Sequence, residues 1–155
     1  MNNDTKTTNY NHLSNDIHIS TGANILYTSA RLMLFLSSKL KPYNLTFQQY
    51  NVLRILRHAN SPVPIKFISD SMIDPCSNCS RLVDKLSEKG LAARLEPETD
   101  KRIVNVTITP AGIALIDNAA SVLFSQFKEK FDVFEEEEIF CLNATLDKLK
   151  TLIDN

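Results

Sequence analysis

The sequence predicts a mainly α-helical protein with one small β-hairpin set between its helices. Apolar residues recur at helical spacing through most of the 155 residues. Only around residues 91–109 does the period change to the alternation of strands. Capping residues and prolines divide the helical part into separate segments, so the elements can be placed in order along the chain.

The first helix is expected from about Ser20 to Leu40, because apolar residues repeat along it and Pro42 follows its end. Its apolar residues occupy more than one face, with Leu32 and Leu34 beyond a single stripe. We therefore expect a second chain to bury part of this helix. The preceding residues, 1–16, are rich in Asn, Thr and Ser and lack an apolar core, which predicts a flexible arm rather than an export signal.

Local capping signals define three helices in the middle of the chain. Thr46 and Gln49 have the spacing of a capping box, which begins a helix that runs to about His58. A loop with two prolines follows, and a short helix begins near Pro64. Asp74-Pro75 is expected to begin the next helix, from Pro75 to about Lys89, with Gly90 as its left-handed C-cap.

The remaining elements are a hairpin and two helices. Leu91–Leu95 and Ile103–Thr109 are expected to pair, with the polar residues 96–102 as their loop. Thr109-Pro110 then begins a long helix that ends near Val133. Glu135–Glu138 fit the first turn of a last helix, which carries Leu142, Leu146, Leu149, and Leu152 or Ile153. A short helix, a turn, a second helix and a hairpin in this order form a winged helix-turn-helix.

Composition narrows the function classes. Hydrophobic residues make up 43% of the chain, enough for one folded unit. The longest apolar run, Leu32–Leu36, is far below the roughly 20 residues of a membrane-spanning helix, so a cytoplasmic protein is expected. The net charge is only −1, yet residues 31–102 hold 12 basic against 7 acidic side chains. This basic middle segment is suited to face an anion.

Enzyme chemistry finds no support in the sequence. There is no Gly-rich phosphate loop, no nucleophile with a paired histidine, and no carboxylate cluster outside Glu135–Glu138. We expect neither a cofactor nor a metal.

The three cysteines are expected to be thiols. Cys76 and Cys79 have the spacing of a redox or metal pair, but a second pair that would complete a zinc site is missing. Cys79 is interpreted as a small buried hydrophobe. Cys76 falls in the expected first helical turn, where the helix dipole lowers a thiol pKa. Redox sensing through Cys76 therefore stays open as an alternative function.

The order of elements resembles that of the multiple antibiotic resistance regulator (MarR) family over roughly residues 20–152. The resemblance is most specific in Ser77-Asn78-Cys79-Ser80-Arg81-Leu82-Val83-Asp84-Lys85-Leu86, Lys89-Gly90-Leu91 with Arg94, Asp100-Lys101-Arg102, Ile108-Thr109-Pro110-Ala111-Gly112 as a variant of Leu-Thr-x-x-Gly, and Glu137-Glu138.

This resemblance implies a DNA-binding regulator, by default a repressor. Short polar side chains at the start of a helix can approach bases and phosphates in the major groove. In the hairpin loop, the wing, the resemblance implies that Arg102 enters the minor groove and that Asp100 holds it. Arg94 and Asp84 are interpreted as an internal pair. The predicted DNA contacts are Ser77, Asn78, Ser80, Arg81, Lys85, Asp100, Lys101 and Arg102.

The resemblance also implies a homodimer that reads pseudo-palindromic double-stranded DNA. Residues 17–44 and 110–155 would be the dimerisation helices, and residues 45–109 the winged helix-turn-helix region. A small aromatic effector is expected between these parts. Tyr27, Arg31, Phe35 and Tyr50 are candidates to line its site, although core packing is the simpler explanation for them. A winged-helix module that binds protein rather than DNA remains the other alternative.

Overall fold

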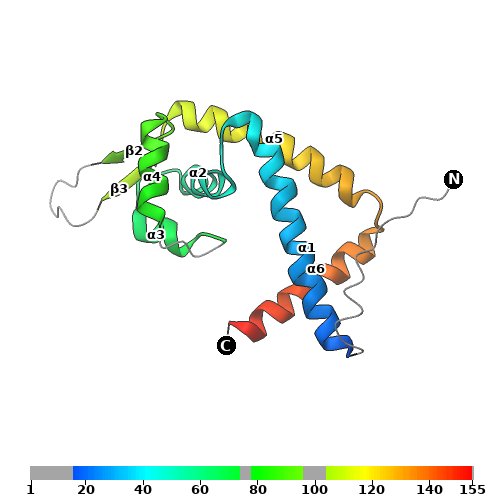
Figure 1. The fold of residues 1–155 in the computed structure, drawn as a ribbon. Coiled ribbons are helices and arrows are strands. Elements are labelled where there is room, and N and C mark those ends of the chain that lie inside the picture. Colours follow the sequence, from blue (N-terminus) through cyan, green and yellow to red (C-terminus); the bar gives the residue numbers. More distant parts are fainter. Residues whose placement is uncertain (1–15, 74–77, 96–103, 155) are drawn as a thin grey trace.

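The structure is a computed structural model that describes residues 16–73, 78–95 and 104–154. A lobe of short helices and a small sheet lies at one end of the molecule, and long helices extend from it to the other end (Figure 1). In chain order the elements are α1 (Ile17–Leu40), η2 (Lys41–Tyr43), α2 (Phe47–Ala59), β1 (Val63–Pro64), α3 (Ile65–Asp70), α4 (Cys79–Glu88), β2 (Ala92–Leu95), β3 (Asn105–Ile108), α5 (Pro110–Phe131) and α6 (Glu136–Ile153).

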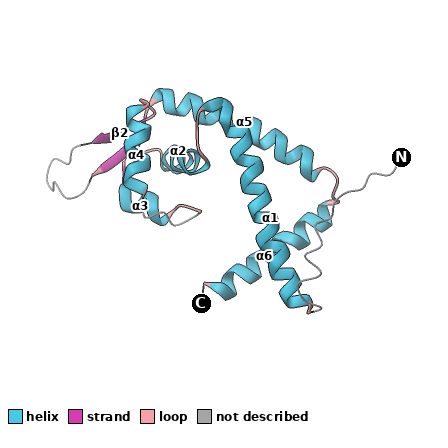
Figure 2. Cartoon of the chain, in the orientation of Figure 1, coloured by secondary structure: helices cyan, strands magenta, loops and turns pink. Residues whose placement is uncertain are grey.

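The fold is mainly α with a small antiparallel sheet, as the sequence predicts (Figure 2). The sheet has three strands in the order β1-β3-β2, so the predicted hairpin gains a third strand, which the sequence does not predict. In this strand Val63 pairs with Val106, and Pro64 pairs with Asn105. Proline is tolerated there because β1 is an edge strand. The pairing fastens the loop before α3 to the hairpin.

The hydrophobic core lies where α2, α3, α4, the sheet and α5 meet. α2 contributes most to it, and Val52 and Leu53 are fully buried. Val83 and Leu86 of α4, Val106 of β3 and Ile116 of α5 complete the packing. Fully burying an aliphatic side chain contributes about 1.5–3 kcal/mol, so this cluster holds the lobe together.

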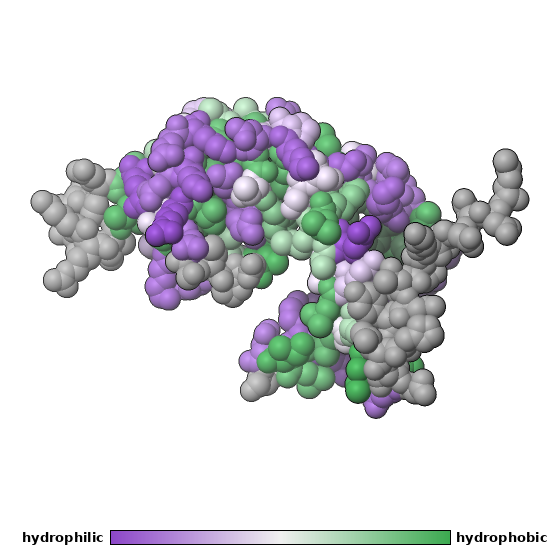
Figure 3. Space-filling view, in the orientation of Figure 1, coloured by the Kyte–Doolittle hydropathy of each residue, from purple (hydrophilic) through white to green (hydrophobic). Residues whose placement is uncertain are grey.

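The core of the lobe does not extend to the far ends of the long helices. In α1 the only buried residue is Leu40, at its last position, and α6 has no buried residue in its 18. Large apolar side chains stay exposed there, among them Leu26 at 72% and Phe140 at 77%. Hydrophobic surface (green) is visible over the C-terminal part of α6 in Figure 3. None of the described helices has the length and apolar character needed to cross a membrane.

Most helix ends agree with the predicted signals, and the capping box of Thr46 and Gln49 is present in full. Gly90 adopts the expected left-handed conformation, with φ of 69°. Two starts differ from the prediction. α1 begins at Ile17 rather than near Ser20, because the Asp16 carboxylate accepts from the backbone N–H of His18. α4 begins at Cys79 after Asn78, not at Pro75, and residues 74–77 lie outside the described residues.

Candidate nucleic-acid interface

Helix α4 is amphipathic, and its polar face is open. Cys79, Val83 and Leu86 point into the core and are buried. Asn78, which precedes the helix, and Ser80, Arg81 and Lys85 are exposed. Hydrophilic surface (purple) covers this part of the molecule in Figure 3. The structure thus brings four predicted DNA contacts onto one exposed face. The other four, Ser77, Asp100, Lys101 and Arg102, lie outside the described residues.

Arg94 of β2 connects the hairpin to α4. Its terminal nitrogen Nη2 forms an ion pair with the Asp84 carboxylate at 2.6 Å, which confirms the predicted internal pair. The same nitrogen donates to the Ser80 hydroxyl at 2.9 Å and to the Ser80 carbonyl at 3.3 Å. A charged guanidinium with these partners fixes the base of the hairpin against the first turns of α4.

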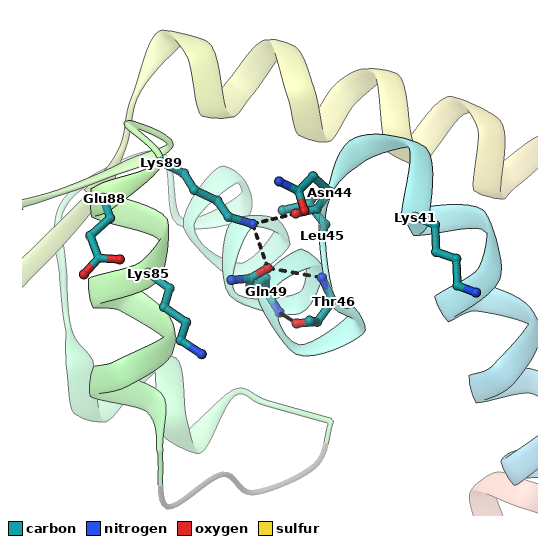
Figure 4. Close-up of a pocket in the computed structure, with 8 residues that line it drawn as sticks. All are labelled: Lys41, Asn44, Leu45, Thr46, Gln49, Lys85, Glu88 and Lys89. Atoms are coloured by element: carbon teal, nitrogen blue, oxygen red, sulfur yellow. Dashed lines mark hydrogen bonds between the residues drawn. The ribbon is translucent and has the colours of Figure 1, made fainter.

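Lys89 connects the other end of α4 to the start of α2. Its Nζ donates to the backbone carbonyl of Asn44 and to Gln49 Oε1, the latter at 3.3 Å. Figure 4 shows the Lys89 side chain reaching from α4 to the capping-box residues, beside an open hollow that Lys41 and Lys85 also line. Asn44 has the positive φ of 53° that ends η2. Lys89 therefore links the C-terminal end of α4 to the segment between α1 and α2.

A second feature of the site is an apolar cavity of about 250 Å³ between α1, α2 and α5. Its lining is aromatic and aliphatic, with one cationic side chain and one amide. The lining residues are Leu36, Phe47, Tyr50, Asn51, Arg54, Ile73, Leu123, Phe124 and Phe127.

The polar groups of the cavity are held in place by each other. Asn51 is 1% exposed, and its Oδ1 accepts from Arg54 Nε at 3.2 Å and from Nη2 at 2.9 Å. Burial raises the pKa of the Tyr50 hydroxyl above its ordinary 10.0, and the Arg54 charge opposes part of that rise. A positioned guanidinium at the edge of an apolar cavity suits an aromatic ligand that carries a carboxylate.

The four predicted effector residues do not all lie at this cavity. Tyr50 lines the cavity, and the Phe35 ring packs edge-on against Phe127, with the ring centroids 6.4 Å apart. Tyr27, Arg31 and Phe35 itself are not among the residues that line this cavity. The cation that lines it is Arg54, which is not among the predicted effector residues. Its spacing from Tyr50 and Asn51 on one helix is the signal that would have found it.

Two of the cysteines can be assessed. Cys79 is 4% exposed, which confirms its interpretation as a small buried residue, and its thiol contacts the Ile65 carbonyl at 3.9 Å. Cys141 is exposed. Cys76 lies outside the described residues.

Comparisons with known proteins agree with this architecture. The model of the MarR family matches residues 45–104. The multiple antibiotic resistance protein MarR of Salmonella typhimurium is 31% identical over 105 residues, 68% of this chain and 72% of its own. The HTH-type transcriptional regulator PecS of Dickeya dadantii is 29% identical over 139 residues, 84% of this chain and 83% of its own. Among solved structures, the S. aureus MepR–DNA complex has a TM-score of 0.77 at 21% identity and covers 86% of this chain and 97% of MepR.

Proposed function

The chain belongs to the MarR family of transcriptional regulators, and from that premise we propose that it binds pseudo-palindromic duplex DNA as a homodimer in the cytoplasm and represses transcription. A small aromatic acid would bind the cavity and release the protein from DNA. Each part of this proposal rests on a different observation.

The DNA-binding part is supported above all by the exposed polar face of α4. The helix presents two short polar side chains near its N-terminus and two basic ones, Arg81 and Lys85, one turn apart. Such a face can enter the major groove and contact phosphates and base edges. The contacts of Arg94 with Asp84 and Ser80, the Arg94 brace, hold the hairpin beside α4. A minor-groove contact by Arg102 requires this arrangement.

The homodimer is supported by the uncovered helices. An 18-residue helix with no buried residue has little to hold it in water as part of a monomer. Exposed apolar residues on α1, such as Leu34, lie on the other helix that the family resemblance assigns to the interface. A second copy of the chain would cover both helices, and two α4 helices would then face half-sites about one DNA turn apart.

The effector is supported by the cavity, because it joins the two functional parts. Leu36 comes from α1, and Leu123 and Phe127 come from α5, whereas Tyr50 and Arg54 come from α2 of the DNA-reading lobe. A ligand that separates these helices would change the angle between the lobe and the dimer helices. Two lobes displaced in this way no longer match their half-sites.

The experiment that tests the proposal is selection of bound duplexes from random-sequence DNA by the full chain, followed by titrations of the recovered sequence. A two-fold symmetric sequence is expected, with affinity that falls steeply as salt rises. Arg102→Ala should weaken binding strongly, whereas the matched control Lys128→Ala, on α5, should not. A chain that enriches no sequence and has no measurable affinity for duplex DNA would favour a protein-binding module instead.

A further inference from the structure

The Arg94 brace does more than fix the hairpin, because it also fixes the hydroxyl of Ser80. Ser80 is the second residue of α4 and is exposed on the face described above. Arg94 Nη2 donates to Ser80 Oγ at 2.9 Å. A serine hydroxyl has one hydrogen to donate and two lone pairs to accept with. A lone pair is directed to Arg94, and no group in residues 16–73, 78–95 and 104–154 accepts the Ser80 hydrogen, so that hydrogen can serve a partner outside the chain.

Two effects determine which partner that hydrogen suits. A hydroxyl that accepts from a charged donor is polarised and becomes a stronger donor itself. Its position in the first turn of α4 also places it near the positive end of the helix dipole. Both effects favour an anionic acceptor over a neutral one.

We propose that Ser80 donates its hydroxyl hydrogen to a DNA backbone phosphate, and that Arg94 is the positioning residue that orients this hydroxyl. The inference rests on the proposed DNA-binding function and extends it to the role of one hydrogen bond. Asp84 completes the arrangement, because its carboxylate holds the same nitrogen at 2.6 Å and keeps the Arg94 side chain directed at α4. Arg94, only 31% exposed in its side chain, acts through Ser80 rather than on the DNA itself.

The first test is a double-mutant cycle measured as affinity for the duplex recovered by selection. Ser80→Ala should weaken binding about tenfold, as expected for loss of a hydrogen bond to a charged group. The conservative variant Ser80→Thr should retain most of the affinity, because it keeps the hydroxyl. In the Arg94→Met background, Ser80→Ala should cost little further affinity, since the hydroxyl is no longer oriented. A full tenfold loss in that background would mean that Arg94 only anchors the hairpin, and would overturn the proposal.

The second test locates the acceptor. In duplexes with a single methylphosphonate at successive positions, one position in each half-site should weaken the wild type but leave Ser80→Ala unaffected. If 7-deazapurine substitution abolishes the difference between the two proteins instead, Ser80 contacts a base and the phosphate assignment is wrong. Urea midpoints of all variants establish that each is folded.

The two proposals fail in distinguishable ways. A wild-type protein that binds no duplex removes the DNA-binding function together with this inference. A wild type that binds while Ser80→Ala binds equally well removes only the inference.

Discussion

Arg57 of α2 and Asp117 of α5 face each other in a bidentate ion pair. Arg57 Nε lies 3.1 Å from Oδ1, and Nη2 lies 3.3 Å from Oδ2. The hydrogen bond and the charge of Asp117 raise the pKa of Arg57 above its ordinary value. The two side chains are 45% and 52% exposed, so water competes with the pair.

Breaking this pair should therefore change stability only slightly. We expect Asp117→Asn to lower the urea midpoint by much less than Leu53→Ala, which removes a fully buried side chain. Equilibrium urea unfolding of both variants, at one protein concentration, gives the comparison. Equal losses from the two substitutions would show that the pair is essential to the packing of α2 on α5.

Gly112 is expected to tolerate no side chain. A Cβ at this position would lie 2.1 Å from the Leu91 carbonyl oxygen and 2.8 Å from Ile108 Cγ1, and the first of these is backbone. Gly112→Ala should therefore destabilise the protein by about 2–3 kcal/mol, in the range of overpacked core substitutions. The matched control is Gly22→Ala in α1, where a Cβ would meet no atom of the described residues within 4 Å and helix propensity improves by about 1 kcal/mol. Thermal unfolding should rank the control at or above the wild type.

The proposed homodimer should depend on the apolar face of α6. Leu149→Asp places a charge on this face, so we expect a shift toward monomer in analytical ultracentrifugation and weaker DNA binding. Lys148→Gln is the matched control, because it changes the neighbouring exposed residue and alters the net charge by the same amount. If both variants sediment like the wild type, α6 is not part of the interface.

Arg54 should determine how tightly the cavity binds an aromatic carboxylate. Arg54→Gln is expected to weaken binding of a simple aromatic carboxylate such as benzoate at least tenfold, because a charge-assisted contact is lost. Calorimetry with benzoate and the neutral benzamide separates the contribution of charge from that of the ring. Arg31→Gln, which removes a cation that does not line the cavity, should bind benzoate like the wild type. The reverse ranking would restore Arg31 as the ligand-binding cation.

Tyr50 should make stability dependent on pH in the alkaline range. Because burial raises its pKa in the folded state, the unfolded chain loses the proton first as the pH rises. The contribution of Tyr50 is therefore complete below about pH 10, where the unfolded tyrosine titrates, and declines above it. Urea unfolding at several pH values should show a shallower alkaline decline for Tyr50→Phe than for the wild type. Parallel curves would mean that the tyrosine is solvated in the folded protein.

The sequence predicted best those features that depend on near neighbours in the chain. The Thr46 capping box and the Thr109 cap could be identified because donor and acceptor are three residues apart. β1 could not, because two residues acquire strand structure only through pairing with a segment some forty positions later. Arg54 was missed for a related reason, since the face of α2 that borders the cavity is decided by the packing of α1 and α5.

The brace between Arg94 and Asp84 was predicted, yet its contact with Ser80 was not. Arg94 and Asp84 are part of the family resemblance, whereas the position of a hydroxyl relative to a guanidinium depends on the register of β2 against α4. The start of α4 at Cys79 also differs from the expected Pro75, although the Asp-Pro pair is a strong local signal. Local rules thus placed the elements, and tertiary packing decided their exact ends and their cross-contacts.

The pairing of β1 with β3 has a consequence for how a signal can reach DNA. This pairing joins the loop before α3 to the hairpin, and Arg94 joins the hairpin to α4. The DNA-binding elements of one chain are therefore linked to one another as one unit. In the proposed homodimer, a ligand in the cavity between α1 and α5 would then move the two DNA-binding units as whole bodies relative to each other. Duplexes that differ only in the number of base pairs between half-sites should measure that displacement. The spacing that the protein binds most tightly should change when the cavity is filled.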